Sequence, residues 1–393
     1  MTPLLLVVNA GSSSLKFQVY DQADAHTLAA TLGGQISGIG TAHPRFRVRD
    51  DQHVRLVDRD LDPTATPDLA HAQQQLIDWL GHHLDREPAA VGHRIVHGGP
   101  WFQDSAVITP GVLTRLESLI PLAPLHQRNN LLPVQVIAQR WPNVVQVACF
   151  DTAFHRDHAP EVERFALPDR FYQQGVRRYG FHGLSYQYIA EHLGRHYPDL
   201  GPRVVAAHLG SGTSACALLN GRSVESTMGF TALDGLPMGT RPGRLDPGVL
   251  LWMLEQGMSH DDIQHVLYFE SGLKGVSGLS ADVRDLLEST APQARLALNL
   301  FMYRTAESLA GLCVALNGLD ALVFTAGVGE NSGAIRAGIC RRLAWLGVRL
   351  NDSANARNAS DISAPDSRVR VLVVPTNEEL VIARQTLAHV LQA

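Results

Sequence analysis

The stretch LLLVVNAGSSSLKF, residues 4–17, constrains the fold most strongly. An apolar run breaks into small, hydrogen-bonding residues and then resumes in rough alternation, with Lys16 just after the turn. This pattern predicts two strands joined by an unusually polar turn. Residues 203–219, RVVAAHLGSGTSACALL, follow the same plan, and the Asn-Gly pair at 220–221 predicts a further hairpin turn. Both halves of the chain therefore begin alike, although no sequence repeat is evident.

Strands and helices are mixed along all 393 residues, which is enough chain for two domains and indicates an α/β or α+β fold. A candidate domain boundary lies near residue 150. The helical pattern at 378–392 has no obvious partner in the second half, so we expect it to pack on the first. Other predictions are a hairpin at 44–58, a helix capped by Thr66, a strand at 89–99, a helix at 129–141, a strand at 144–150 and an exposed connection at 350–368.

Composition excludes several classes of function. Lys plus Arg is 33 and Asp plus Glu is 38, a net charge of −5 that gives no reason to expect nucleic acid or an anionic membrane as a partner. The apolar run at 4–8 is too short for a signal-peptide core, and no window approaches the ~20 apolar residues of a membrane span. The four cysteines are scattered without a C-x-x-C pair, which favours reduced, buried thiols and a cytoplasmic location.

Glycine turns after strands are the first indication of phosphate binding. They occur near Gly11, at 210–212 and at 327–331, and glycine lets backbone N–H groups converge on an anion. The chain has no G-x-x-x-x-G-K-[ST] motif, so the P-loop design is excluded. What remains is a nucleotide held by hairpin loops from both halves. The turns alone leave ordinary loops as an equally good interpretation.

Charged residues in apolar or glycine-rich settings strengthen the phosphate hypothesis. Arg94 lies in an otherwise apolar strand and Arg241 in a glycine- and proline-bound loop, while His182 precedes a helix that Ser185 would cap. An arginine fork fits phosphate or carboxylate oxygens at two points. Singly, each arginine could pair with a structural acid, and Asp151 and Glu378 could begin a turn and a helix. Together they supply the working parts of phosphoryl transfer.

Eight strings, in order from residue 9 to residue 383, resemble the acetate kinase family: NAGSSSLKF, GHRIVHGG, PLAPLH, FDTAFH, RRYGFHG, GFTALDGLPMGTR, FTAGVGENS and TNEELVIA. The resemblance implies an α/β fold of two duplicated actin-like (ribonuclease H-like) domains with an active-site cleft between them. The expected domains are 1–150 plus about 380–393, and 151–379. The implied reaction is reversible, Mg²⁺-dependent transfer from ATP to acetate, giving ADP and acetyl phosphate, with Mn²⁺ as an alternative metal. A cytoplasmic homodimer is also expected.

By the same resemblance, site residues fall into four groups. Asn9 and Glu378 are expected to place the metal. Asp151, His182 and Arg241 are the expected catalytic residues, the last two stabilising the phosphoryl group in transfer. The expected substrate-binding residues are Arg94 at the acetate carboxylate, His126, and Val96, Leu125 and Phe181 around the methyl group. The expected nucleotide-binding residues are Lys16, His208, Leu209, Gly210, Ser211, Gly212, Asp282, Val283, Arg284, Gly327, Val328, Gly329, Glu330 and Asn331.

Acetate chemistry bears on the role of Asp151. The pKa of acetate is close to that of a glutamate side chain, ~4.3, so the nucleophile is already ionised at neutral pH. We therefore hypothesise that Asp151 orients Arg94, Arg241 or hydrated Mg²⁺ rather than removing a proton from the substrate.

Departures from the family pattern leave alternatives open. Ser211 replaces the usual Asn, Pro242 and Arg244 stand beside Arg241, and Leu184 and Tyr186 replace more polar residues. Ala232 replaces a proline of the acetate pocket, and one extra methylene is discriminated by only ~1–3 kcal/mol. A kinase preferring propionate or butyrate is therefore the nearest alternative. An actin-like nucleotide switch without an acceptor is the alternative from another class.

Overall fold

A computed structural model describes residues 3–11, 13–22, 27–124 and 126–392, and these form two compact units. Unit 1 comprises Met1–Phe154 and Asn377–Ala393, and unit 2 comprises His155–Thr376. The expected domains, 1–150 plus about 380–393 and 151–379, stay a prediction, and Asp151 belongs to unit 1. The expected cleft between the domains stays a prediction.

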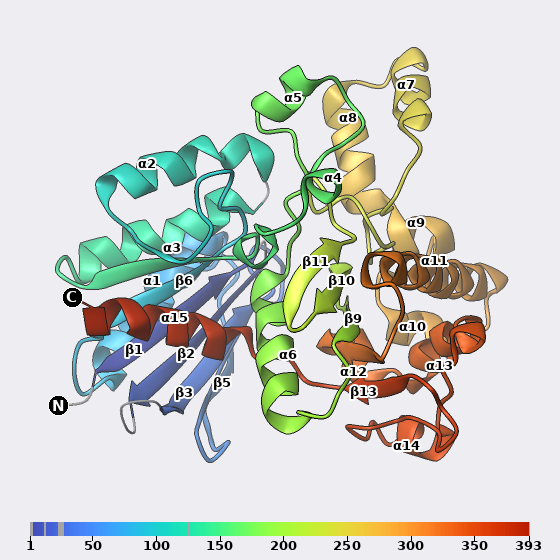
Figure 1. Cartoon of the computed structure of the whole chain (residues 1–393). Helices are drawn as coiled ribbons and strands as arrows, with labels where there is room; N and C mark the ends of the chain where they lie inside the picture. Colours follow the sequence, from blue (N-terminus) through green and yellow to red (C-terminus); the bar gives the residue numbers. More distant parts are fainter. Residues whose placement is uncertain (1–2, 12, 23–26, 125, 393) are drawn as a thin grey trace. The chain divides into compact units, whose positions relative to one another are not determined.

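Unit 1 is built on a sheet with the strand order β5-β4-β3-β2-β1-β6-β8-β7 (Figure 1). The first five strands along the chain pair antiparallel, whereas β6 and β8 lie parallel to β1. The strands are β1 (Leu4–Ala10), β2 (Ser14–Gln22), β3 (Leu28–Ser37), β4 (Arg45–Asp50), β5 (Arg55–Asp60), β6 (Ala90–Ile95), β7 (Ala106–Val107) and β8 (Val145–Phe150).

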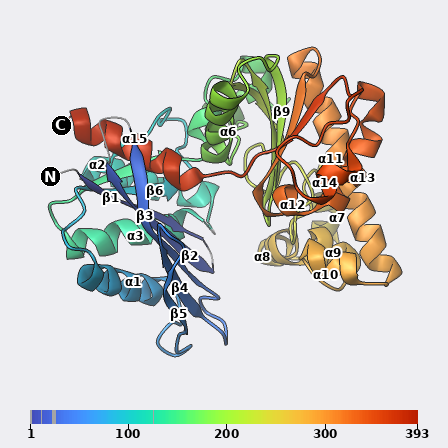
Figure 2. The same cartoon turned by 90° about the horizontal axis from the view of Figure 1, so that it is seen from below.

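Helices cover both faces of this sheet (Figure 2). On one face, α1 (Leu69–His83) and α3 (Gln127–Arg140) close a core that includes Leu6 and Val8 of β1. Because side chains alternate along a strand, Val7 and Asn9 face the opposite side. There α15 (Glu378–Gln392) packs on β1, β6 and β8, as expected for the last helix (Figures 1 and 2). The remaining helices of unit 1 are α2 (Pro110–Ser118) and the 3-10 turns η1 (Ile120–Leu122) and η2 (Ala153–His155).

The predicted start of α1 was wrong. Asp68 is the N-cap, because its carboxylate accepts a hydrogen bond from the backbone N–H of His71. Thr66 is fully buried before the helix, and its hydroxyl accepts a hydrogen bond from Gln75.

Unit 2 repeats the topology of the centre of unit 1. Its sheet has the order β11-β10-β9-β12-β13, in which β9, β10 and β11 are antiparallel and β12 and β13 lie parallel to β9. This matches β3-β2-β1-β6-β8 strand for strand. The strands are β9 (Arg203–Leu209), β10 (Thr213–Leu219), β11 (Arg222–Ser226), β12 (Ala321–Thr325) and β13 (Arg370–Val373). Asn220 and Gly221 both have positive φ, as the predicted β10–β11 turn requires.

One face of the unit 2 sheet packs on α11 (Pro292–Leu316) and the segments around α13 (Gly333–Arg342), and α6 (Gly183–His196) contacts β9. Two predictions are corrected here. Residues 326–331 form a helix, α12 (Ala326–Asn331), rather than a glycine turn. Residues 350–368 hold the short helix α14 (Asp352–Ala356), and Ile362 is buried, so this segment is not a simple exposed loop.

The other helices of unit 2 are α4 (Pro160–Glu163), α5 (Asp169–Gln173), α7 (Pro247–Glu255), α8 (His260–His265), the π-helix η3 (Val266–Glu270), α9 (Gly272–Ser277), α10 (Val283–Glu288) and the 3-10 turn η4 (Ala344–Leu346). Among the described residues, no helix is long and apolar enough to cross a lipid bilayer. All four cysteines are free thiols and buried, as expected.

Gly92 of β6 sets the distance between the unit 1 sheet and α15. A Cβ atom at Gly92 would lie within 2.6 Å of the Ile382 side chain and closer still to the Thr386 hydroxyl. We expect Gly92→Ala to push α15 away from the sheet and to cost about 1–3 kcal/mol, the usual cost of overpacking. The measurement is the thermal unfolding midpoint followed by circular dichroism.

The matched control is Gly311→Ala, at an exposed position of α11 where a Cβ would meet nothing within 4 Å. This change should leave the midpoint unchanged or raise it, because alanine favours a helix over glycine by about 1 kcal/mol. Equal effects of the two changes would contradict the assignment of Gly92.

Candidate functional site

One group of expected site residues lies in unit 1, at the carboxyl ends of three neighbouring strands. Val8 pairs with His93 in the parallel register of β1 and β6, so Asn9 and Arg94 follow at the next position of each strand. Asp151 directly follows β8, and its backbone N–H donates to the carbonyl of Ile95 at 3.0 Å. Strand ends of a parallel sheet are where α/β proteins bind ligands.

Arg94 is the centre of this group. Its Nη2 and Nε atoms donate to the two Asp151 oxygens at 2.6 and 3.0 Å, and its Nη1 donates to Asn9 Oδ1 at 3.3 Å. Glu378, the first residue of α15, places Oε2 3.8 Å from Arg94 Nε. Burial alone would lower the pKa of Arg94, but Asp151 and Glu378 outweigh it, so the pKa is raised and the guanidinium stays charged.

Glu378 lies in a region with surplus negative charge. Burial is the main reason that its pKa is raised well above the usual range. The nearby cations Arg94 and Lys16 oppose this shift, while Asp151 and Glu379 add to it. A divalent cation would relieve this surplus, and amide and carboxylate oxygens such as those of Asn9 and Glu378 are ligands that Mg²⁺ accepts. The described residues contain no group of three or more His, Cys, Asp or Glu able to hold a metal alone.

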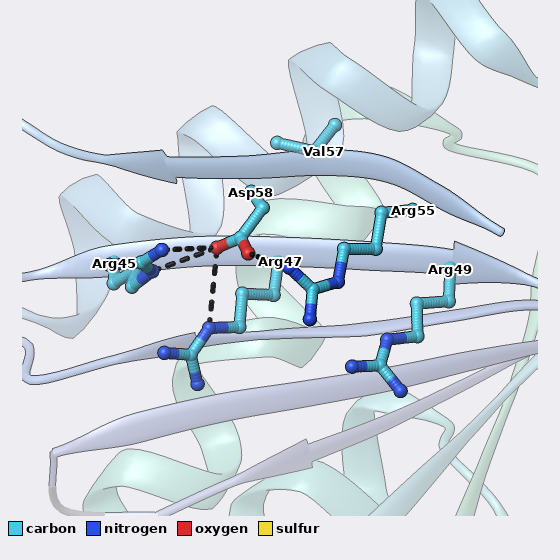
Figure 3. Close-up of a pocket in the computed structure, with 6 residues that line it drawn as sticks. All are labelled: Arg45, Arg47, Arg49, Arg55, Val57 and Asp58. Carbon is cyan, nitrogen blue, oxygen red and sulfur yellow. Dashed lines mark hydrogen bonds and ion pairs between the residues drawn. The ribbon is translucent and has the colours of Figure 1, made fainter. Parts of the chain in front are cut away.

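Lys16 is exposed on β2, opposite Asn9 in the β1–β2 register. Farther along the sheet, Arg45, Arg47 and Arg55 surround the carboxylate of Asp58 (Figure 3). Arg45 also pairs with Asp60, at 3.3 Å. The shortest of these ion pairs, at 2.8 Å, joins Arg45 Nη2 to Asp58 Oδ1. The hydrogen bond from Arg45 is the main cause that lowers the pKa of Asp58.

The expected acetate pocket is only partly described in unit 1. Val96 is buried just after β6, and His126 is the N-cap residue of α3. Leu125 lies outside the described residues. Sequence reasoning missed Asn130, which is buried on α3: its side chain accepts from Val96 N–H at 2.9 Å and donates to the Ala10 carbonyl at 2.8 Å.

A second group of expected site residues lies in unit 2 and begins at the N-terminus of α6. His182 is the N-cap in the left-handed region, with φ of 58°, and makes no side-chain capping bond. The predicted cap, Ser185, instead contacts His208. His155, missed as a site residue although it ends the string FDTAFH, contacts the Phe181 carbonyl with Nε2 at 3.0 Å. A Cβ at Gly180 would collide with the His155 ring, so this turn needs glycine.

His182 and Arg241 converge on the glycine turn between β9 and β10. His182 Nε2 and Arg241 Nη2 both lie 3.4 Å from the position that a Cβ at Gly212 would take. The absence of a side chain at Gly212 therefore leaves space beside an imidazole and a guanidinium. Such a space suits an anion, because both groups offer N–H donors.

Arg241 differs from Arg94 in its lack of an acidic partner. Arg241 Nη1 donates to the Ala232 carbonyl at 2.8 Å, and no carboxylate within the described chain forms an ion pair with it. Burial lowers the pKa of Arg241, with Tyr268 opposing that effect. A partly buried cation without a counter-ion is poised to bind an anion.

The rings of His182 and His208 stack with centroids 4.2 Å apart. Each Nδ1 atom contacts a serine hydroxyl, Ser214 at 2.8 Å for His182 and Ser185 at 2.9 Å for His208. His208 Nε2 lies 3.6 Å from the Cβ position of Gly210. Both Nε2 atoms therefore approach the glycine turn 210–212.

Other expected nucleotide residues surround the same turn. Gly239 N–H donates to the Ser211 carbonyl at 3.3 Å, and a Cβ at Gly239 would lie 3.2 Å from the carbonyl of Ala281, next to Asp282. Ala326 of α12 is close to Gly210. The expected residues in these neighbouring segments are His208, Leu209, Gly210, Ser211, Gly212, Asp282, Val283, Arg284, Gly327, Val328, Gly329, Glu330 and Asn331.

Within these segments some side chains contact one another. Asp282 caps α10 and pairs with Arg284 at 2.6 Å. Glu330 accepts from the Thr376 backbone N–H at 3.2 Å, and Asn331 donates to the Gly327 carbonyl at 2.9 Å. These contacts leave the nucleotide roles as predictions.

Arg336 holds α12 in place and was missed by sequence reasoning. It is fully buried on α13 and donates to the carbonyls of Gly329 and Glu330 at 2.8 and 2.9 Å. It also donates to the side chain of Asn355 at 2.8 Å. An arginine near a glycine-rich segment was the only signal in the sequence.

The α/β fold, the group around Arg94 and the group around His182 and Arg241 suit a phosphotransferase. Comparison with known proteins identifies the class of enzyme. The model of the acetokinase family matches residues 4–384. The acetate kinase of Nitrobacter hamburgensis is 52% identical over 389 residues, covering 98% of this chain and 96% of that protein. The acetate kinase of Rhizobium meliloti is 50% identical over 386 residues, covering 98% of both.

Solved structures agree. A propionate kinase from Francisella tularensis superposes with a TM-score of 0.90 at 34% identity, covering 98% of this chain and 99% of that chain. The acetate kinase of Porphyromonas gingivalis gives 0.83 at 36% identity, with the same coverage. The chain is thus an actin-like phosphotransferase whose acceptor is a carboxyl group. It belongs to the acetokinase family, which confirms the resemblance predicted from the sequence.

The buried His155 and the half-buried His158 predict acid sensitivity of unit 2. Burial lowers the pKa of His155 to about 3 and that of His158 to about 4, and both rings contact the Ser223 hydroxyl at 2.7 Å. In the unfolded chain a histidine titrates near pH 6.5. The contribution of these neutral histidines to the free energy of unfolding is therefore complete above that pH and is lost as the pH falls toward 4. At pH 5, proton uptake by each of these histidines in the unfolded state should lower the free energy of unfolding by about 2 kcal/mol.

The measurement is the thermal unfolding midpoint between pH 7.5 and pH 5. We expect His158→Gln to weaken the dependence on pH, because one buried titrating group is removed. The exposed His260→Gln is the control and should keep the wild-type slope. Parallel curves for wild type and His158→Gln would contradict the prediction.

Proposed function

We propose that the chain transfers the γ-phosphoryl group of ATP reversibly to acetate, giving ADP and acetyl phosphate. In the forward direction a carboxylate oxygen forms a bond to γ-phosphorus, and the bond from phosphorus to the ADP oxygen breaks. The carrying observation is the approach of His182 Nε2 and Arg241 Nη2 to one small space at Gly212 in an acetokinase-family chain. Repulsion between two anions is the main barrier to this reaction, and preorganised N–H donors in a dry site lower it.

Arg94 is proposed to bind the acetate carboxylate, with Val96, Leu125, His126 and Phe181 around the acyl group. Acetate, whose pKa is ~4, is ionised at neutral pH and needs no general base. Asp151 uses both oxygens on Arg94, at 2.6 and 3.0 Å, and this supports a role in orienting the guanidinium. We therefore assign Asp151 as the group that fixes the acetate-binding arginine.

On the phosphoryl side, His182 and Arg241 are proposed to neutralise the charge that develops on the transferred group. Backbone N–H groups of the turn 210–212 and of 282–284 and 327–331 are proposed to bind the nucleotide, with Lys16 contributing from unit 1. Ser211 retains a small hydrogen-bonding side chain where the family usually has Asn. The supporting observation is that these unit 2 segments are neighbours around Gly210 and Gly239.

Mg²⁺ is the proposed metal, with Mn²⁺ as an alternative. Asn9 and Glu378 would hold it, because they offer oxygen ligands where negative charge is in surplus. When bound with the nucleotide, the ion would neutralise phosphate charge.

Acetate is the proposed acceptor, and propionate is the second candidate because of Ala232. The Ala232 carbonyl accepts from Arg241, a contact that any residue at 232 can make. Replacement of the usual proline therefore changes the pocket wall and leaves this hydrogen bond available. One solved relative is a propionate kinase.

The test is trapping of the acyl phosphate with hydroxylamine in the presence of ATP, Mg²⁺ and acetate, propionate or butyrate. We expect acyl hydroxamate with acetate, and we expect Arg241→Ala to lower kcat by about 10²–10³-fold, as loss of a transition-state donor does. The neighbouring, exposed Arg244→Ala is the control and should keep nearly wild-type turnover.

Each other outcome is informative. Absence of hydroxamate with all three acids would favour a nucleotide switch instead of a kinase. An Arg241→Ala variant with normal kcat and only a raised KM for acetate would refute the phosphoryl-side assignment.

We further propose that the protein is a cytoplasmic homodimer. Buried free thiols suit a reducing compartment. Helix α7 supports the dimer, because none of its residues is buried although Leu251, Trp252 and Leu254 are 62%, 57% and 52% exposed. An apolar helix left uncovered indicates an interface, and a second copy of the chain is the proposed partner.

We expect Trp252→Glu to convert the dimer to monomers, because a charge at the centre of an apolar interface is costly to bury. The measurement is the molar mass by light scattering after size exclusion. Val54→Glu, on the exposed β4–β5 turn of unit 1, is the matched control and should stay dimeric. A monomeric wild type would contradict the dimer. A dimeric Trp252→Glu variant would contradict the assignment of α7 to the interface.

A further inference from the structure

A chain of three polar side chains links α6 to β10 behind the phosphoryl-side histidine. His182 Nδ1 lies 2.8 Å from Ser214 Oγ, and the Tyr186 hydroxyl lies 2.5 Å from the same oxygen. Tyr186 and Ser214 are both fully buried, whereas His182 is half-buried at the end of α6. Ser214 pairs with His208 across β10 and β9, so the chain runs beneath the two stacked imidazoles.

The hydroxyl of Ser214 has one proton, and this limits how the hydrogen bonds among His182, Ser214 and Tyr186 can be arranged. If Ser214 donates to His182 Nδ1, the imidazole carries its proton on Nε2, and Ser214 can accept from the Tyr186 phenol. If His182 donates from Nδ1 instead, Nε2 is bare and can only accept. The orientation of one serine hydroxyl therefore decides what the imidazole offers at the glycine turn.

Of these two arrangements of the neutral imidazole, only the one with the proton on Nε2 suits the proposed reaction. His182 Nε2 is the atom that approaches Gly212 beside Arg241 Nη2. A bare Nε2 would present a lone pair to an anionic phosphoryl oxygen and repel it, whereas Nε2–H donates a hydrogen bond.

We propose that Tyr186 is a positioning residue for phosphoryl transfer, acting through Ser214 to hold the His182 proton on Nε2. This inference rests on the proposed function, since it assigns a partner to His182 within that site. The phenol donates to Ser214 and thereby directs the serine proton toward His182 Nδ1. Tyr186 itself touches no reacting atom.

The tyrosine ring and its hydroxyl have separable roles. The ring makes edge contacts with His155 and His208, at centroid distances of 5.8 and 6.4 Å, and these contacts fill space. Phenylalanine would fill the same space and would lack only the hydroxyl. Tyr186, which replaces a more polar residue of the family pattern, thus places a buried hydroxyl next to Ser214.

The experiment compares Tyr186→Phe with Tyr188→Phe, the same substitution two residues along α6 at a half-buried site. We expect Tyr186→Phe to lower kcat about 3- to 10-fold, the effect of one hydrogen bond, with KM for ATP and acetate nearly unchanged. Tyr188→Phe should match wild type. Nitrogen-15 NMR of labelled histidine should show Nε2–H at His182 in wild type and a mixture of tautomers in Tyr186→Phe.

A double-mutant cycle tests the path through the serine. Ser214→Ala should lower kcat at least as much as Tyr186→Phe, and adding Tyr186→Phe to Ser214→Ala should have no further effect. Additive effects overturn the proposal. So does a fall in kcat without a change of tautomer, because that outcome assigns Tyr186 a purely structural role.

His182→Gln separates this inference from the proposed function. The variant identifies the His182 NMR signal by its loss, and its turnover tests the role of the imidazole directly. Wild-type turnover in His182→Gln refutes the assignment of His182 in the reaction. Impaired His182→Gln with fully active, tautomer-unchanged Tyr186→Phe refutes the inference alone.

Discussion

Parallel pairing of the central strands is the constraint on which the group of candidate site residues in each unit depends. In unit 1 the register of β1 with β6, and of β6 with β8, brings Asn9, Arg94 and Asp151 to one edge. In unit 2 the same topology brings the end of β9 and the start of α12 together. Alternation along each strand then decides which side chains enter the core and which face α15 or α6.

The two principal arginines show how surroundings divide similar groups between tasks. Arg94 donates to both oxygens of Asp151 and lies near Glu378, so its guanidinium is held in place and stays charged. Arg241 donates to a backbone carbonyl and forms no ion pair with a carboxylate of the described residues, and burial lowers its pKa. The first arrangement suits a substrate that binds in the ground state. In the second arrangement, the positive charge of the Arg241 guanidinium is balanced only when an anion binds next to it.

Sequence reasoning failed where competing local signals were close together. Thr66 and Asp68 are both good caps, and the helix begins after Asp68 because its carboxylate reaches the His71 N–H. Glycines at 327 and 329 suggested a turn, but the buried Arg336 holds the carbonyls of Gly329 and Glu330 in a helix. In the first case two candidate caps lie only two residues apart, so local sequence alone does not choose between them. In the second case the contact of Arg336 with α12 forms only when α12 and α13 pack together.

The sequence by itself determined the duplicated strand–turn–strand plan, the family and the residue types of the site, because periodicity and motifs are local properties. Tertiary structure alone decided that Asp151 uses both oxygens on Arg94, that Glu378 arrives from the last helix, and that Tyr186 reaches His182 through Ser214. These contacts join residues up to hundreds of positions apart. Their formation depends on long-range strand register and helix packing, which no single segment encodes.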